Sequence, residues 1–228
     1  CKTFIRLLSV LYCKFTLLSF KSVFMRQKLL ILIISIFLVS PNLFGEEKIM
    51  LYGDSLMVGY GLDKKYQLST ILETNLNKSG FKVKIISASV SGDTSAGGLN
   101  RISWTLKEPN IDIFVLGLGA NDMLRGISPK ETYKNLEKII LKVTNKQIDI
   151  LLAGMIAPTS HGITYKKEFD NIYSELAKKY NLQILPFLLK DVALKPELNL
   201  NDGMHPNAKG TVIISKNLEK KIKRFLNK

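Results

Sequence analysis

Short apolar runs alternate with amphipathic stretches along most of the chain, and this alternation restricts the fold more than any other feature. The apolar runs predict five strands, at Lys48–Tyr52, Val83–Ala88, Ile111–Leu118, Ile148–Ile156 and Gln183–Pro186. Helical periodicity or helix caps predict helices at Gln67–Ser79, Thr94–Lys107, Pro129–Lys146, Tyr165–Tyr180 and Pro206–Phe225. Strands that alternate with helices favour right-handed crossovers, so we predict an α/β fold, a three-layer α/β/α sandwich around a five-stranded parallel sheet.

Composition excludes several classes of protein. The 228 residues are 46% hydrophobic and 23% charged, which is typical of a globular chain that builds its own core. The chain has two cysteines, Cys1 and Cys13, and two histidines, His161 and His205. Zinc fingers, iron–sulfur clusters and disulfide scaffolds need more ligands or pairs than these, so we exclude them.

The beginning of the chain has the pattern of a secretory signal over residues 25–45. Arg26 and Lys28 follow Met25, and the apolar run Leu29–Val39 has 11 residues, which is the length of a signal core and too short to span a bilayer. Cleavage near Gly45 would leave residues 46–228 as a single domain in the periplasm of a bacterium, or secreted. We interpret residues 1–24 as an upstream extension without an assigned role; an N-terminal anchor over residues 1–40 is the alternative.

The basic charge is concentrated at the start of the chain. Residues 1–28 contain six basic residues and no acidic one, so the rest carries +8 of the total net charge of +14. A charge of +8 favours transient contact with anionic membrane surfaces, although a coding bias toward lysine explains it equally well. The basic residues are scattered among acids without interleaved aromatics, so we expect no nucleic acid partner.

Three short polar segments follow the first three predicted strands. Gly53-Asp54-Ser55 places a serine at a strand-to-helix turn, where its hydroxyl can act as a nucleophile. Asp54 can brace that turn by accepting backbone N–H groups. Gly92 allows its backbone N–H to approach a ligand oxygen, and Asn121 can donate its side-chain amide to a developing oxyanion. Taken alone, the Ser55 segment favours an ordinary turn with a capping serine, and the other two segments are also consistent with ordinary turns.

A fourth segment precedes the last predicted helix. Asp202 and His205 lie three residues apart, so the carboxylate can reach the imidazole that it must orient. Ser55, His205 and Asp202 are therefore candidates for nucleophile, base and orienting acid.

Together the four segments resemble the SGNH, or GDSL, hydrolases. The four marker residues of that family match Ser55, Gly92, Asn121 and His205 in the expected order. The surrounding sequence over roughly residues 48–225 is similar to the bacterial arylesterase and thioesterase I/lysophospholipase branch, whose members are typically exported to the periplasm. One departure is Ala120, where the branch commonly has a second glycine.

The resemblance implies a flavodoxin-like SGNH hydrolase fold and hydrolysis of carboxylic esters or thioesters through an acyl-enzyme. It implies Ser55, Asp202 and His205 as catalytic residues, an oxyanion hole formed by Ser55, Gly92 and Asn121, and no metal or other cofactor. We expect a monomer that acts on an acyl ester, a thioester or a lysophospholipid.

The sequence indicates the substrate-binding residues less clearly than the catalytic ones. In the resembled branch the region of residues 158–164, a predicted loop, borders the acyl groove. Candidate substrate-binding residues are those near the predicted strand ends: Asp54, Met123, Leu124, Ile156, Pro158 and Ile163. We expect His161 to be a loop residue near the groove and not a second base. The alternatives are a carbohydrate or peptidoglycan O-acetylesterase, and a non-catalytic binding module at the cell envelope on the same fold.

Overall fold

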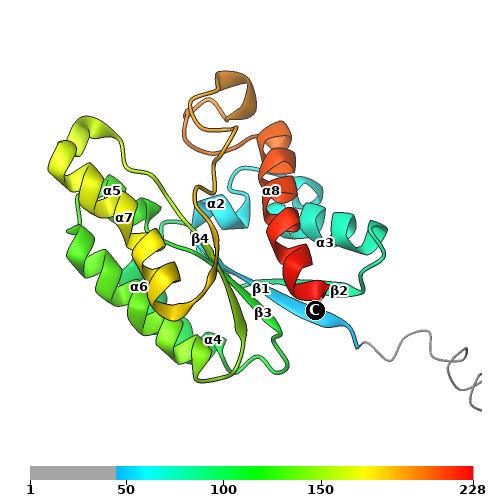
Figure 1. The fold of residues 1–228 in the computed structure, drawn as a ribbon. Coiled ribbons are helices and arrows are strands. Elements are labelled where there is room, and N and C mark those ends of the chain that lie inside the picture. The colour runs from blue at the N-terminus through cyan, green and yellow to red at the C-terminus, as the bar shows by residue number, and fades with distance from the viewer. Residues whose placement is uncertain (1–44, 228) are drawn as a thin grey trace, which may run out of the picture. The chain divides into compact units, whose positions relative to one another are not determined.

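The computed structural model describes residues 45–227 and shows one five-stranded parallel sheet (Figure 1). The strand order is β2-β1-β3-β4-β5, which is the flavodoxin-like order. The strands are β1 (Glu47–Gly53), β2 (Val83–Ser87), β3 (Ile113–Gly117), β4 (Asp149–Ala153) and β5 (Gln183–Leu185). The predicted fold class is confirmed. Residues 25–44 of the predicted signal, and the extension before them, lie outside the described residues.

Helices cover both faces of the sheet (Figure 1). One layer contains α3 (Leu68–Lys78) and α8 (Ala208–Leu226), which pack on each other. The other contains α4 (Ser95–Thr105), α6 (Pro129–Thr144) and α7 (Ile163–Tyr180). Every residue of the central strand β3 is buried, as expected for a parallel strand covered on both faces.

The predicted boundaries differ from the structure where local caps decide them. Helix α8 begins at Ala208 and not at Pro206, because the Asn207 side chain accepts hydrogen bonds from the backbone N–H groups of Lys209 and Gly210. Strand β4 ends at Ala153, three residues before Ile156. Residues 158–164 are not an irregular loop, since they contain a 3₁₀ turn at Thr159–His161 and the start of α7.

Two short helices follow their strands after only one or two residues. Helix α2 (Ser55–Val58) follows β1, and α5 (Ala120–Leu124) follows β3. Because β1 and β3 are parallel neighbours, both helices begin at the same edge of the sheet. That edge also receives the segment after β2, so the polar segments noted in the sequence converge there. No helix within residues 45–227 combines the length and the apolar character needed to cross a membrane.

Candidate active site

Ser55, His205 and Asp202 form a continuous hydrogen-bonded chain at the carboxyl edge of the sheet. Nε2 of His205 lies 2.9 Å from Oγ of Ser55, and Nδ1 lies 2.7 Å from Oδ2 of Asp202. The Ser55–His205 contact joins residues 150 positions apart in the sequence. This is the geometry in which imidazole can accept the serine proton while the carboxylate fixes its orientation.

The local fold around Asp202 holds its carboxylate as an anion. Its Oδ1 accepts the backbone N–H groups of Met204, at 2.8 Å, and of His205, at 2.9 Å. These two bonds and the His205 side chain lower the pKa of Asp202 to about 2. Asp202 is therefore ionised at every pH above about 3, where it can stabilise an imidazolium on His205.

A tight approach between strands places Ser55. A Cβ atom on Gly53 would lie 2.5 Å from the carbonyl oxygen of Gly117 on β3, so only glycine fits at this position. Asp54 then caps α2, accepting the N–H of Leu56 at 3.0 Å, which confirms its predicted bracing role. As the first residue of α2, Ser55 has no intrahelical acceptor for its own N–H.

Asp54 is buried, with 1% of its surface exposed, so the structure corrects its assignment as a substrate-binding residue. Its second oxygen accepts the side-chain amide of Asn121 at 3.3 Å. Burial raises the pKa of Asp54 to about 6 despite these two bonds.

The raised pKa of Asp54 makes the free energy of unfolding decrease as the pH rises. Because the folded state holds the Asp54 proton more tightly than the unfolded state, stability falls as pH rises from about 4 to about 6. We expect the wild type to lose up to about 3 kcal/mol relative to Asp54→Asn across this window. Urea denaturation of both proteins between pH 4 and pH 7 measures this, and parallel stability curves would contradict the expected burial effect.

Gly92, the second oxyanion donor expected from the sequence, lies in the segment after β2. Gly92 has φ +80°, in the region that favours glycine, and its carbonyl accepts Nη2 of Arg125 at 2.9 Å. Arg101 holds the same segment, since its guanidinium donates to the Asp93 carboxylate at 2.7 Å and to the Gly53 carbonyl at 3.3 Å. These contacts tie the Gly92 segment to the end of β1, which carries Ser55.

Asn121 projects from the first turn of α5, and its neighbour Asp122 holds the helix in place. Asp122 is fully buried and accepts the backbone N–H of Ser95 at 2.7 Å, the Ser95 hydroxyl and the Thr132 hydroxyl at 3.2 Å. It thereby joins α5 to α4 and α6. The Nδ2 atom of Asn121 carries two hydrogens, and its bond to Asp54 uses one of them.

Tyr60 is a site residue that motif analysis did not assign. Its ring lies against the His205 imidazole with centroids 4.6 Å apart and planes tilted by 40°. Tyr60 is 51% exposed, so this contact lies at the surface of the site. Tyr60 lies close to Ser55 in the sequence, but nothing in that spacing indicates a contact with a residue 145 positions later.

We expect the Tyr60 ring, rather than its hydroxyl, to hold the imidazole in place. A ring contact of this kind contributes about 0.5–1.5 kcal/mol, so Tyr60→Leu should lower kcat about two- to tenfold while Tyr60→Phe keeps it. Steady-state kinetics on a soluble ester with both variants measures this. Equal losses in the two variants would assign the effect to the hydroxyl, and no loss in either would remove Tyr60 from the site.

A cleft of about 610 Å³ opens over Ser55 and His205, and its lining is mostly apolar. Of the predicted substrate-binding residues it includes Met123, Leu124, Ile156 and Pro158. Ile163, the first residue of α7, is 79% exposed and absent from the lining, so the structure does not place it in the cleft. His161 lies against Tyr165, with ring centroids 5.0 Å apart and planes tilted by 45°, and is also outside the lining.

Sequence reasoning missed the part of the cleft wall that follows β5. This part consists of Phe187, Leu189, Ala193, Leu194 and Met204. Met155 and Ala157, after β4, were missed as well. These residues lie in irregular segments, where hydrophobic periodicity gives no signal.

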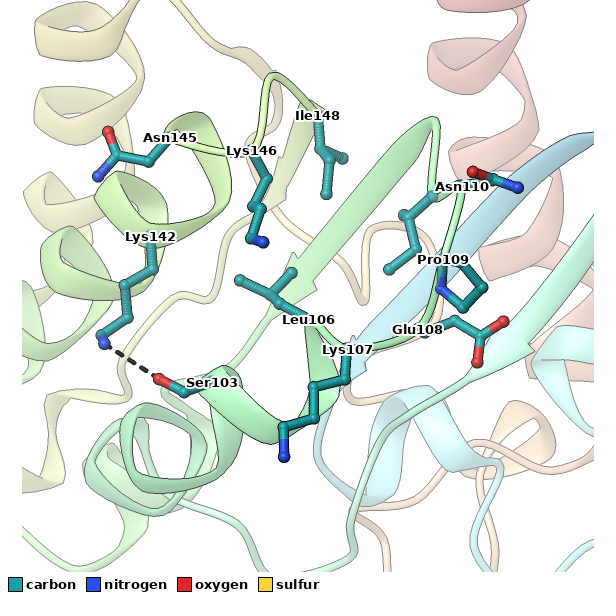
Figure 2. Close-up of a pocket in the computed structure, with 11 residues that line it drawn as sticks. Ser103, Leu106, Lys107, Glu108, Pro109, Asn110, Lys142, Asn145, Lys146 and Ile148 are labelled. Atoms are coloured by element: carbon teal, nitrogen blue, oxygen red, sulfur yellow. Dashed lines mark hydrogen bonds between the residues drawn. The ribbon is translucent and has the colours of Figure 1, made fainter.

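A second hollow lies at the opposite edge of the sheet, and its lining is more polar than that of the cleft (Figure 2). Its volume is about 760 Å³, and Lys107, Lys142 and Lys146 line it beside Glu108. Lys142 donates to the Ser103 hydroxyl at 3.1 Å (Figure 2). The hollow contains none of the polar residues that surround Ser55. Among residues 45–227, no cluster of three or more His, Cys, Asp or Glu side chains could hold a metal ion.

Comparison with known proteins agrees with this geometry. Residues 51–213 match the model of the GDSL-like lipase/acylhydrolase family. The chain is 34% identical to an arylesterase of Vibrio mimicus, over 78% of this chain and 88% of the relative. It is 33% identical to thioesterase 1/protease 1/lysophospholipase L1 of Escherichia coli K12, over 79% and 86%. The crystal structure of the psychrotrophic esterase EstA from Pseudoalteromonas sp., inhibited by monoethylphosphonate, superposes with a TM-score of 0.76 at 30% identity, covering 80% of this chain and all of that chain.

Proposed function

The chain belongs to the GDSL-like lipase/acylhydrolase family, the SGNH hydrolases, and is an ester-hydrolysing enzyme; we propose that it cleaves carboxylic esters or thioesters of apolar acyl chains through an acyl-enzyme on Ser55. The observation that carries this proposal is the hydrogen-bonded chain Ser55–His205–Asp202 beneath an apolar cleft. The relatives named as arylesterase and as thioesterase/lysophospholipase support an acyl ester, an acyl thioester or a lysophospholipid as the substrate.

In the first half of the reaction, Oγ of Ser55 attacks the carbonyl carbon while His205 takes the serine proton. The bond to the leaving group breaks as His205 passes that proton to the departing alcohol or thiol. Asp202 holds the imidazole in the tautomer with a proton on Nδ1 and stabilises the imidazolium. In the second half, water attacks the acyl carbon while His205 takes its proton. The bond to Oγ of Ser55 then breaks as His205 returns that proton to Oγ, and the carboxylic acid leaves.

The oxyanion that forms in both halves needs donors placed in advance. We assign this role to the backbone N–H groups of Ser55 and Gly92 and to the side chain of Asn121. A shift of the Asn121 side-chain amide away from Asp54 would shorten its hydrogen bond to the substrate oxygen. That hydrogen bond would become stronger as negative charge develops on the oxygen in the transition state.

Asn121→Ala should lower kcat about 10²–10³-fold with little change in KM, because the lost donor acts mainly in the transition state. Kinetics on p-nitrophenyl butyrate with the wild type and the variant measures both constants. Asn145→Ala, on the surface at the end of α6, is the matched control. A loss confined to KM would contradict the oxyanion role.

Hydrolysis of p-nitrophenyl esters from acetyl to palmitoyl by residues 46–228 tests the substrate class. We expect kcat/KM to rise beyond acetyl, because most of the cleft lining is apolar and gains contact with each added methylene. Activity confined to acetyl would favour a glycan O-acetylesterase. A folded protein without any Ser55-dependent ester hydrolysis would favour the binding module instead.

We also propose that the enzyme is exported, with the periplasm or the exterior of a bacterial cell as its location. The support is the basic and apolar pattern of residues 25–45, read from the sequence alone. Mass spectrometry of the N-terminus of protein recovered from the periplasm or medium tests this. A mature chain that begins near residue 46 is expected, and retention of residues 25–45 in the cytosol would contradict it.

A further inference from the structure

Five apolar side chains in the cleft lining are strongly exposed. Among residues 45–227, eleven large hydrophobic residues are exposed, and five of these line the cleft over Ser55. They form what we call the apolar rim: Tyr60, Leu124, Ile156, Leu194 and Met204. They come from four different parts of the fold, so their convergence on one opening is a property of the tertiary structure.

Leu194 is the most exposed residue of the rim, with 95% of its surface accessible. It also borders a neighbouring hollow of about 460 Å³, so it stands on a ridge between two depressions. This side chain borders the opening of the cleft and keeps most of its surface accessible to solvent. It projects outward from the opening.

The segment around Leu194 is built to present it. Its backbone has φ +63°, a conformation that costs a non-glycine residue free energy. The buried side chain of Asn199 donates to the carbonyls of Val192, at 3.0 Å, and Lys195, at 2.8 Å, on either side of Leu194. Val192 itself is fully buried. The turn is thus anchored on both sides while its apolar residue points to solvent.

We propose that the apolar rim docks the enzyme on an anionic phospholipid surface, with Leu194 inserted among the acyl chains and the cleft opening facing the lipid. This rests on the proposed function, since an acyl chain bound in a bilayer would then reach Ser55 without crossing water. Burial of a leucine side chain in an apolar phase supplies the local attraction. The turn around Leu194 adds little charge, because Lys190 and Lys195 are balanced by Asp191 and Glu197. The longer-range attraction comes from the net charge of +8 on the domain.

Two other arrangements fit the observations less well. A second copy of the chain is a poor occupant, because five partly exposed side chains fall short of the ~800 Å² per partner that a stable complex buries. Docking through the opposite edge would use the lysine-lined hollow of Figure 2 with Trp104, which is 75% exposed at the end of α4. Among the described residues, no exposed large hydrophobic side chain lines that hollow.

Trp104 makes the orientation measurable, because it is the single tryptophan of the chain. Two proteins are compared on vesicles of phosphatidylethanolamine and phosphatidylglycerol, both with Ser55→Ala so that nothing is hydrolysed. One keeps Trp104, and the other carries Trp104→Phe and Leu194→Trp. We expect the emission of the tryptophan at position 194 to shift to shorter wavelength and to resist iodide quenching, while Trp104 shows neither change.

Affinity for the vesicles provides the second measurement. Leu194→Ser should lower the partition coefficient about tenfold, and the matched control Leu141→Ser on α6 should leave it unchanged. A shift at Trp104 or a loss with Leu141→Ser would place the contact at the opposite edge and overturn the proposal. So would an absence of vesicle binding, or concentration-dependent dimerisation that Leu194→Ser abolishes. Hydrolysis of soluble esters by the enzyme with Ser55 intact tests the proposed function separately from all of these outcomes.

Discussion

Replacing Ser55 with alanine is expected to lower kcat for p-nitrophenyl butyrate by about 10⁶-fold, the size of loss that follows removal of a triad nucleophile. The hydroxyl oxygen is the only atom removed, and its partner His205 keeps its bond to Asp202. The fold should not change, because Ser55 caps nothing and Asp54 closes the first turn of α2.

The control for this loss is Ser174→Ala, which removes an exposed serine on α7 far from the cleft. It should retain full activity. Circular dichroism and a urea midpoint near that of the wild type establish that the Ser55 variant is folded. Substantial residual hydrolysis by the folded Ser55→Ala protein would mean that another group attacks the ester.

Replacing Asp202 with asparagine should lower kcat about 10⁴-fold. The asparagine oxygen can still accept the N–H groups of Met204 and His205, so the turn keeps its shape. Its amide nitrogen, however, would donate to Nδ1 of His205 and favour the wrong tautomer, with a proton on Nε2 facing Ser55. The variant also loses the negative charge that stabilises the imidazolium.

Kinetics of Asp202→Asn beside Asp63→Asn, an exposed aspartate outside the site, measures this effect. Asp202→Glu should recover part of the activity if the negative charge matters, because it restores the anion with imperfect geometry. An Asp202→Asn enzyme within tenfold of the wild type would show that the carboxylate only shapes the turn.

Much of the fold could be predicted because buried parallel strands have a continuous apolar sequence. Ile113–Gly117 is such a strand, and turn residues mark its end. The edge strand Val83–Ser87 is only partly buried, with Lys84 and Ser87 exposed, but its three β-branched residues favour a strand. The boundaries of helices were harder to predict where two sequence signals compete for the same position. Pro206 suits a first helical turn, but Asn207 provides a side-chain oxygen for the free N–H groups, and the helix begins after it.

The candidate triad could be predicted because each of its parts is local. Asp202 and His205 meet within one turn of the chain, and Ser55 follows a strand at the edge where parallel sheets bind ligands. The cleft wall could not be predicted in the same way. Leu194 and Met204 lie in irregular segments without periodicity, and only the tertiary structure brings them beside Ser55.

Asp54 lies in a sequence motif of the active site but does not line the cleft. Its place beside the nucleophile suggested contact with substrate, whereas the structure buries it beneath Asn121. Ile163 shows the converse, since an apolar residue close to the site in sequence points to solvent from the first turn of α7. The direction of this side chain depends on where α7 begins. The predicted start, Tyr165, lies two residues after the observed start.

The most direct test of the acyl-enzyme on Ser55 is mass spectrometry of the enzyme after reaction with an activated phosphonate ester. Ser55 should displace the leaving group and retain one phosphonyl group per chain, and peptide mapping should place that group on Ser55. Formation of the adduct should stop in Ser55→Ala and slow strongly in His205→Ala. An active enzyme that gives no adduct, or an adduct on a different residue, would contradict Ser55 as the nucleophile.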